Sequence, residues 1–276
     1  MARPRLSLFI VLFVIVGGLL LLFFSYPIAV LLLVGSSGLE EALRVRSFEL
    51  ALLVTIITST IAAVASVIFG VPLAYLMSRY NFRGKSLVES LIDLPIAIPH
   101  IIVGVMIVLA FSWYVGLGPI FHRLHINVVD TILGAAMAVT YVSATYSVRV
   151  VESAINMLDP ELELTAMSLG ASRARTFVSV VLPKIRRSIA GGALTSWARA
   201  ASEAGALFIV AYEVCLGKSL VYPAPVAIYE AYVGIGIIEA AKFSAAMLVV
   251  VLGIFVLARI LLEARRGSRA GLGAQA

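Results

Sequence analysis

Long apolar stretches separated by short polar segments dominate the chain. A helix needs about 20 apolar residues to cross the hydrocarbon core of a bilayer, and five or six stretches reach that length. We predict spans near residues 6–34, 49–78, 90–115, 130–151, 188–212 and 242–262. The apolar runs are continuous and do not alternate with polar residues, which favours helices over the strands of a membrane barrel. The pattern therefore predicts an all-α membrane protein with six transmembrane helices.

The composition agrees with this class. The 276 residues are 62% hydrophobic and 13% charged, with a mean hydropathy of +1.07, and a soluble domain cannot bury that much apolar surface. The single cysteine, Cys215, excludes an intrachain disulfide and a multi-cysteine metal site. The net charge of +6 comes from basic residues in loops rather than on one soluble face. We therefore expect neither a metal site nor a nucleic-acid partner.

The first apolar stretch follows Arg3 and Arg5, so a signal peptide is its alternative interpretation. The apolar region of a signal peptide is about 7–15 residues long and precedes a cleavage site with small residues. This stretch is about twice as long, and no clear cleavage site follows it. We expect a retained membrane helix.

Basic residues predict the topology, because Lys and Arg accumulate in cytoplasmic loops. With six spans, thirteen of them fall on one side and five on the other. The richer side holds Arg3, Arg5, Arg79, Arg83, Lys85, Arg173, Arg175, Lys184, Arg186, Arg187, Arg265, Arg266 and Arg269, and the poorer side holds Arg44, Arg46, Arg123, Lys218 and Lys242. We predict a multi-pass protein of the cytoplasmic membrane with both termini in the cytoplasm.

One polar segment of more than twenty residues, 160–183 (the coupling segment), separates two predicted spans on the cytoplasmic side. Pro160 suits the first turn of a helix and Asp159 is a good N-cap. Gly170 is placed to end that helix, Ser172 is placed to cap a second one, and Pro183 is expected to break it. The pattern alone fits two interpretations: a compact knob that contacts a partner, or an amphipathic linker on the membrane surface.

The coupling segment resembles the EAA loop of ABC-transporter permeases. The matching residues are Pro160, Glu161, Leu162, Ala166, Ser168, Leu169, Gly170, Ala171, Ser172, Phe177, Val180, Leu182 and Pro183. In that family the loop inserts a short coupling helix into a separate ATPase subunit. The resemblance implies an ATPase-coupling loop, within residues 159–185, made by Glu161, Glu163, Leu164, Thr165, Ala166, Leu169, Gly170, Ala171, Phe177 and Pro183.

The segment departs from the family pattern at two positions. Leu164 and Thr165 stand where the family has the glutamate and the first alanine of its triplet, and only Ala166 remains. Two alternatives follow: Glu163 substitutes for the glutamate, or the contact with the ATPase is more apolar.

The chain lacks an ATP site of its own. It contains the triplets Gly84-Lys85-Ser86 and Gly217-Lys218-Ser219, but a P-loop needs another glycine five residues before the first residue of each triplet. Arg79 and Tyr212 occupy those positions. We therefore expect no cofactor in this chain, and ATP and Mg belong to the partner ATPase.

A wider resemblance covers residues 49–262. Residues 72–100, 197–213 and 224–232 resemble the molybdate and tungstate permeases, and sulfate permeases share much of the pattern. The resemblance implies a homodimer, two ABC ATPase subunits and an extracytoplasmic oxyanion-binding protein. The expected organisation is an N-terminal helix and external loop (1–48), a five-helix permease core (49–262) and a basic cytoplasmic tail (263–276).

Arg199 and Glu203 lie midway along the fifth predicted span. Each charge there costs about 2.5–3.5 kcal/mol on insertion scales, so both should face protein or water. Their i,i+4 spacing allows them to pair. Two interpretations follow. In the first, Arg199 has a role in transport, because it helps a dianion to pass or braces a gate. In the second, the two residues form a structural ion pair.

Other polar residues in the predicted spans are weaker candidates for a translocation path. Hydroxyls of Ser143, Thr145 and Ser196 either line such a path or serve close helix packing. His100 follows Pro95 and Pro99 at a broken start of the third span, where freed backbone groups need partners. His122 and His125 have a metal-like spacing, but no further ligand is evident nearby.

The sequence thus predicts a permease subunit of a type I ABC importer that moves tungstate or molybdate by alternating access. A sulfate, thiosulfate or other anion permease is the alternative within the family. A membrane-embedded enzyme would need paired carboxylates, a His/Asp cluster or a nucleophile–base pair at membrane depth, so we expect a transport subunit and no enzyme. A passive channel would leave the coupling segment unexplained.

Overall fold

The structure is a computed structural model that describes residues 8–112, 115–217 and 219–270, with side chains described as far as Glu263. Its helices are α1 (Leu8–Gly35), α2 (Leu39–Arg44), α3 (Arg46–Arg79), α4 (Lys85–Ala97), α5 (His100–Phe111), α6 (Gly118–Arg123), α7 (Ile132–Asn156), α8 (Glu161–Ser168), α9 (Arg173–Thr176), α10 (Leu182–Ala201), α11 (Leu207–Val210), α12 (Ala224–Gly234) and α13 (Ile237–Ala270). A 3₁₀ turn (Ser36–Gly38), a π-helical turn (Phe177–Val181) and an antiparallel hairpin of β1 (Val214–Leu216) and β2 (Ser219–Val221) complete it.

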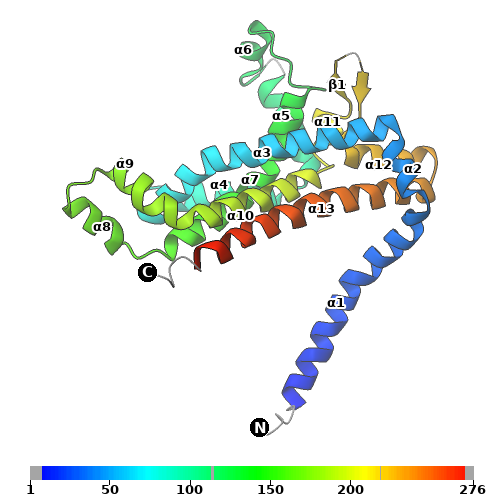
Figure 1. Cartoon of the computed structure of the whole chain (residues 1–276). Helices are drawn as coiled ribbons and strands as arrows, with labels where there is room; N and C mark the ends of the chain where they lie inside the picture. The colour runs from blue at the N-terminus through cyan, green and yellow to red at the C-terminus, as the bar shows by residue number, and fades with distance from the viewer. Residues whose placement is uncertain (1–7, 113–114, 218, 271–276) are drawn as a thin grey trace.

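Helices α3, α7 and α10 form the centre of the molecule, with α13 alongside, whereas α1 extends away from the rest (Figure 1). Small residues allow this close packing, as is usual between membrane helices. The hydroxyl of Ser196 on α10 lies 3.0 Å from that of Ser66 on α3 and 3.1 Å from that of Ser143 on α7. A three-way hydroxyl contact therefore joins the three central helices.

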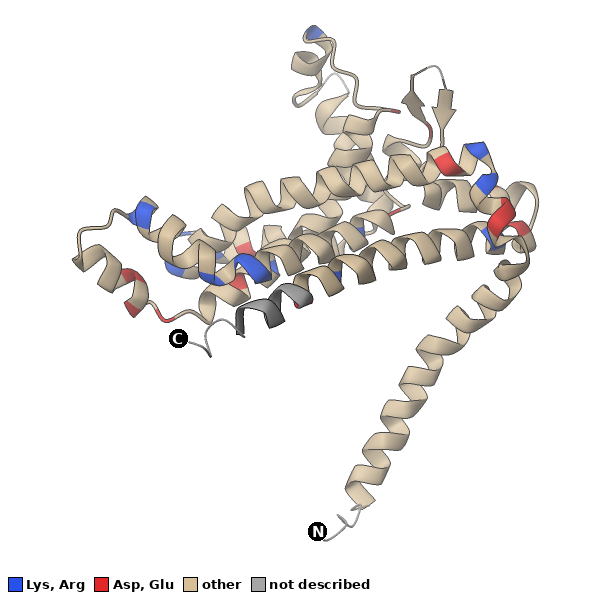
Figure 2. Ribbon diagram, viewed as in Figure 1, with Lys and Arg blue, Asp and Glu red and all other residues tan. Residues whose placement is uncertain are grey.

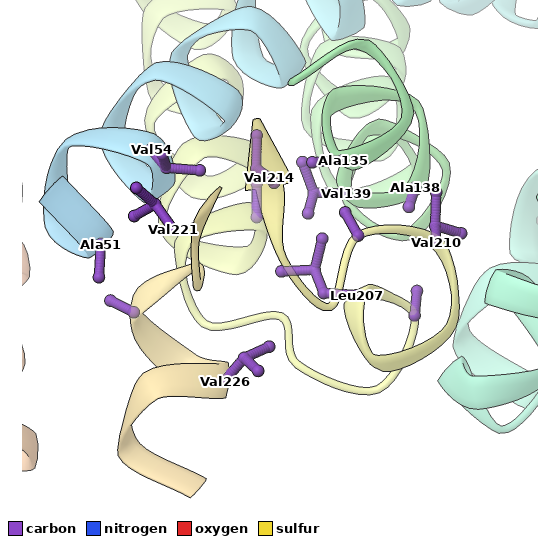
Figure 3. Close-up of a cluster of buried hydrophobic side chains, with 14 of the residues drawn as sticks. Ala51, Val54, Ala135, Ala138, Val139, Leu207, Val210, Val214, Val221 and Val226 are labelled. Carbon is purple, nitrogen blue, oxygen red and sulfur yellow. The ribbon is translucent and has the colours of Figure 1, made fainter. Parts of the chain in front are cut away.

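The main apolar core lies toward the end of the bundle that carries the hairpin. Figure 3 shows side chains of α3, α7, α11, α12 and both strands meeting there, among them Val54, Val139, Leu207 and Val214. Close approach of backbones is needed at Gly134, because a Cβ on this residue would lie 1.9 Å from the carbonyl oxygen of Val128. The hairpin and α12 are thus packed parts of the fold rather than a loose loop.

Charged residues gather at the ends of the bundle, around α8 and α9 at one end and around α2 at the other (Figure 2). Among the described residues, α1, α3 and α13 are long and apolar enough to cross a membrane, and the bent pair α4–α5 makes a fourth candidate. These correspond to the predicted spans 6–34, 49–78, 242–262 and 90–115. The count of six spans stays a prediction, since α7 and α10 do not reach that apolarity.

The third predicted span is not one straight helix. The axes of α4 and α5 are bent by 117° at a short break, where Ile98 has an extended backbone. A residue that precedes a proline is disfavoured in the helical region, and Pro99 follows Ile98. The predicted break at the start of this span is confirmed, and it divides the span into α4 and α5.

The fifth predicted span, 188–212, is also wrong in its bounds. Helix α10 begins earlier, at Leu182, and ends at Ala201. A turn of five residues follows before the short helix α11. Glu203 therefore lies in the turn just beyond the helix rather than within it.

Some sequence predictions fall on parts that the structure does not describe. Arg3, Arg5 and Lys218 lie outside the described residues, as do residues 113–114 of the third span and the end of the basic tail, residues 271–276. The side chains of Arg265, Arg266 and Arg269 are also outside them.

Replacing Gly134 with Ala should destabilise the protein, because the added Cβ meets a backbone oxygen that no side-chain rotation can move. Overpacking of this kind costs about 1–3 kcal/mol. Gly253→Ala is the matched control, since a Cβ at Gly253 meets nothing within 4 Å. We expect a lower thermal unfolding midpoint in detergent for Gly134→Ala and an unchanged one for the control; equal midpoints would contradict the close approach.

Candidate functional site

The coupling segment forms two short helices, α8 and α9, that project beyond one end of the bundle (Figure 1). Oδ1 of Asp159 accepts a hydrogen bond of 2.9 Å from the backbone N–H of Glu161 at the start of α8. Gly170 has φ of +89° directly after that helix, a conformation that favours glycine. The hydroxyl of Ser172 accepts a hydrogen bond of 3.3 Å from the N–H of Arg175. The Ser172 cap and the glycine turn are confirmed, whereas α8 begins one residue later than predicted, at Glu161, with Pro160 at its N-cap position.

Pro183 does not break the second helix, contrary to the prediction. The chain runs on from α9 through the π-helical turn, Phe177–Val181, into α10, and Pro183 stands in the first turn of α10. A proline is tolerated there, and a π turn often absorbs a local mismatch in helical hydrogen bonding. The coupling segment is therefore continuous with a central helix of the bundle.

Glu163 faces the bundle rather than solvent. Its side chain is 10% exposed and both of its carboxylate oxygens are bound by residues of the last turns of α3. Nε of Arg79 donates to Oε1 at 2.7 Å, and the hydroxyl of Tyr75 donates to Oε2 at 2.7 Å. Nη2 of Arg79 also donates to the carbonyl oxygen of Leu158 at 3.0 Å. The sequence alternative in which Glu163 contacts the ATPase does not fit this geometry.

The exposed side of α8 is mixed, with leucines beside the polar residues Glu161, Thr165 and Ser168, and one more exposed leucine follows the helix. Leu164 is 58% exposed and Leu169 is 85% exposed, while Glu161 and Thr165 are exposed beside them. The remaining predicted coupling residues lie closer to the bundle: Ala166, Ala171 and Phe177 are half-buried, and the ring of Phe177 lies 4.9 Å from that of Tyr75 between centroids. Exposed leucines are therefore available for an apolar contact, and the nature of the contact with the ATPase stays a prediction.

A second polar cluster joins the two broken spans. Oε2 of Glu203 lies 3.0 Å from Nη2 of Arg199 and 2.9 Å from Nδ1 of His100. The same Arg199 nitrogen lies 2.8 Å from Nδ1 and 3.0 Å from Nε2 of His100. The three side chains close a hydrogen-bonded ring, with the Glu203 side chain only 1% exposed.

This ring sits where the two chain breaks meet. His100 is the first residue of α5, and Oε1 of Glu203 accepts a 2.9 Å hydrogen bond from the N–H of Ala206 at the start of α11. A Cβ on Gly205 would lie 2.9 Å from the Cβ of His100, so the two breaks touch. Irregular backbone at membrane depth needs such internal partners. The sequence predicted that Arg199 and Glu203 could pair and singled out His100 separately, and the structure brings the three together.

The hydroxyls proposed to line a path are enclosed by helices. Ser143 and Ser196 are fully buried in the three-way contact already described. Thr145 is also buried, and its hydroxyl donates to the carbonyl oxygen of Ile92 on α4 at 2.6 Å. Their observed contacts are those of helix packing.

Sequence reasoning missed one charged cluster. Arg149, inside the fourth predicted span, holds Asp93 of α4 through two hydrogen bonds of 2.8 and 2.5 Å and Glu152 through one of 2.7 Å. An arginine three residues before a glutamate is a recognisable helical pair. The partner on α4 was not predictable, because Asp93 and Arg149 are 56 residues apart in the chain.

The described residues contain no group of three or more His, Cys, Asp and Glu side chains that could hold a metal ion. Their polar clusters consist of ion pairs and hydroxyl contacts.

Comparisons with known proteins identify the family of this chain. The profile of the family described as "Binding-protein-dependent transport system inner membrane component" matches residues 66–264. The chain belongs to this family. It is a multi-pass membrane protein and a transport permease subunit, not an enzyme.

Two groups of relatives bear on its substrate. The chain is 36% identical over 253 residues to a molybdate/tungstate transport system permease protein of Thermococcus kodakarensis, covering 90% of this chain and 94% of that one. It is 34% identical over 158 residues to a sulfate transport system permease protein of Escherichia coli, covering 57% of each.

A solved bacterial alginate ABC transporter, in complex with an alginate-bound periplasmic protein, contains a chain with the same fold. The match has a TM-score of 0.70 and 18% sequence identity, and covers 95% of each chain. The likeness confirms the type I ABC importer fold.

Removing Arg199 alone should be more damaging than removing it together with Glu203. Arg199→Ala leaves a buried carboxylate without its guanidinium, and breaking a buried pair costs about 3–5 kcal/mol. The double change Arg199→Ala, Glu203→Ala removes both charges, so we expect a smaller loss of thermal stability in detergent. If the double variant loses more stability than the sum of the losses in the two single variants, the pairing is ruled out.

Proposed function

We propose that this chain is the permease subunit of an ATP-driven importer that moves a tetrahedral oxyanion, molybdate or tungstate, by alternating access. The observation that carries the proposal is the coupling segment, which presents exposed leucines beyond the bundle while a buried ion pair fixes it to α3. The family match and the molybdate/tungstate relatives along nearly the whole chain support it.

The proposed partner of the coupling segment is one of two separate ABC ATPase subunits, which bind and hydrolyse ATP with Mg. Leu164 and Leu169 are the exposed side chains best suited to insert into an apolar groove on that subunit. Gly170 gives the turn after α8 its compact shape. In this proposal the apolar contact replaces the acidic one that the family pattern would supply.

Motion of the coupling segment would reach the membrane domain through two connections. One is the ion pair of Glu163 with Arg79, together with the Tyr75 hydroxyl, at the end of α3. The other is the continuous helical path from α9 into α10. Because α3 and α10 are both central helices, displacement of the segment reorients the core rather than a peripheral loop.

The assembled transporter in this proposal contains two copies of the chain and receives its substrate from an extracytoplasmic oxyanion-binding protein. The coupling segment and both termini face the cytoplasm, as the bias of basic residues predicts. The solved relative in complex with its periplasmic binding protein supports a partner of that kind.

Within the membrane, the ring of His100, Arg199 and Glu203 is the proposed gate or contact point of the translocation path. Arg199 supplies the positive charge that an oxyanion seeks, and its side chain is 20% exposed. Glu203 already neutralises that charge. An anion would therefore bind weakly and leave again, as a pathway requires.

Sulfate is the second candidate substrate, because sulfate permeases are 34% identical over about half of the chain. Calorimetry of the cognate binding protein with tungstate, molybdate and sulfate distinguishes a molybdate or tungstate importer from a sulfate importer. We expect tight binding of tungstate and molybdate and much weaker binding of sulfate. Nanomolar sulfate binding without the other two would replace the proposed substrate.

Replacing Leu169 with Asp should uncouple the ATPase. An apolar anchor removed from a docking interface typically costs about 2 kcal/mol or more, which weakens the contact about 30-fold. Since Leu169 is 85% exposed, the fold should be unaffected. Met157→Asp is the control, because Met157 is 83% exposed but lies before α8. Transport-stimulated ATP hydrolysis should be lost only in Leu169→Asp, and normal hydrolysis there would refute the docking role.

A further inference from the structure

A groove between α10 and α13 has a charged end and an apolar floor. Its volume is about 310 Å³. Helix α10 contributes Arg187, Gly191 and Leu194, which lie at helical spacing on one face, and α13 contributes Phe255, Arg259 and Leu262. The two helices run in opposite directions, so residues early in α10 meet residues late in α13.

The two arginines lie toward the end of the bundle that carries the coupling segment. Arg187 is five residues into α10, which begins directly after the π-helical turn. At 1.5 Å per residue this places it about 8 Å along the helix from that end. Leu194 and Phe255 lie about two turns and one turn, respectively, nearer the middle of the bundle than the arginine on the same helix. The groove therefore changes from cationic to apolar along the direction in which a lipid changes from headgroup to chain.

The arginines are available to an added anion. Among the described residues, Arg187 forms no ion pair or side-chain hydrogen bond, and it is exposed. Arg259 pairs with Glu263 at 3.2 Å, but their side chains are 67% and 59% exposed. Exposed pairs of this kind contribute about 0–1 kcal/mol, so the guanidinium can turn toward a phosphate. With Glu263 counted, the groove keeps a net positive charge.

We propose that this groove binds one anionic phospholipid of the cytoplasmic leaflet. The phosphate lies between Arg187 and Arg259, and an acyl chain follows the floor made by Leu194 and Phe255. Basic pockets between membrane helices on the cytoplasmic side are suited to lipid headgroups. The assignment to this leaflet rests on the proposed cytoplasmic position of the coupling segment, but the binding itself does not require transport.

Gly191 keeps the floor of the groove open. A Cβ added there meets no atom of the chain within 4 Å, so a larger side chain fills the groove without straining the helix. Gly253 on α13 also has nothing within 4 Å of an added Cβ and does not line the groove. The pair Gly191→Leu and Gly253→Leu therefore separates filling of the groove from the general effect of a leucine on a membrane helix.

The test uses the full transporter purified in detergent and stripped of lipid. Native mass spectrometry measures binding of dioleoyl phosphatidylglycerol and dioleoyl phosphatidylcholine, with inorganic phosphate as a competitor. We expect phosphatidylglycerol to bind about tenfold more tightly than phosphatidylcholine. Inorganic phosphate at the same concentration should not displace it, because it makes no contact with the apolar floor.

Two sets of variants complete the test. Arg187→Gln with Arg259→Gln should reduce phosphatidylglycerol binding to the level of phosphatidylcholine, whereas Arg83→Gln with Arg123→Gln, which removes the same charge elsewhere, should not. Gly191→Leu should weaken both lipids and Gly253→Leu neither. Equal binding of the two lipids by the unmodified chain, or unchanged phosphatidylglycerol binding in the Arg187/Arg259 variant, would overturn the proposal. These experiments measure lipid binding and not transport. Their outcome can therefore be distinguished from a failure of the proposed function.

Discussion

The buried ion pair between Glu163 and Arg79 is the contact on which the proposed function depends. It joins the coupling segment to α3, the helix that runs the length of the bundle and packs against both other central helices. The Tyr75 hydroxyl occupies the second oxygen of the same carboxylate, so little freedom remains at this joint. Without this joint, the helical path from α9 into α10 would be the remaining connection described between the coupling segment and the central helices.

The ring of His100, Arg199 and Glu203 has the corresponding role deeper in the bundle. Two spans are broken at the same place, and each break leaves backbone groups that need partners. Glu203 contacts both spans, since it accepts from the backbone N–H of Ala206 in one and binds the side chain of His100 at the break in the other. The charged side chains, the two chain breaks and the contact between the breaks therefore lie at one place. A rearrangement of the core would change polar contacts most at this place.

Much of the coupling segment and of the broken spans was predictable from the sequence, and the predictions that failed did so for physical reasons. The Ser172 cap and the glycine turn depend on neighbouring residues, so the sequence predicted them correctly. The break before His100 was signalled by its prolines, but a bend of 117° was not, because it depends on packing against Gly205. Pro183 was misjudged because a π turn relieves the mismatch that normally ends a helix. The burial of Glu163 and the pairing of Arg149 with Asp93 depend on residues far apart in the chain, which a local pattern does not reveal.

Replacing the ion pair with a covalent link tests the central claim most directly. In a Cys215→Ser background, Arg79→Cys with Glu163→Cys removes the ion pair, and a short bifunctional thiol reagent can then join the two positions. Transport coupled to ATP hydrolysis, measured in reconstituted vesicles, should be low before the link and restored after it. Normal transport before linking, or no recovery after complete linking, would show that the joint between the coupling segment and α3 does not transmit the motion.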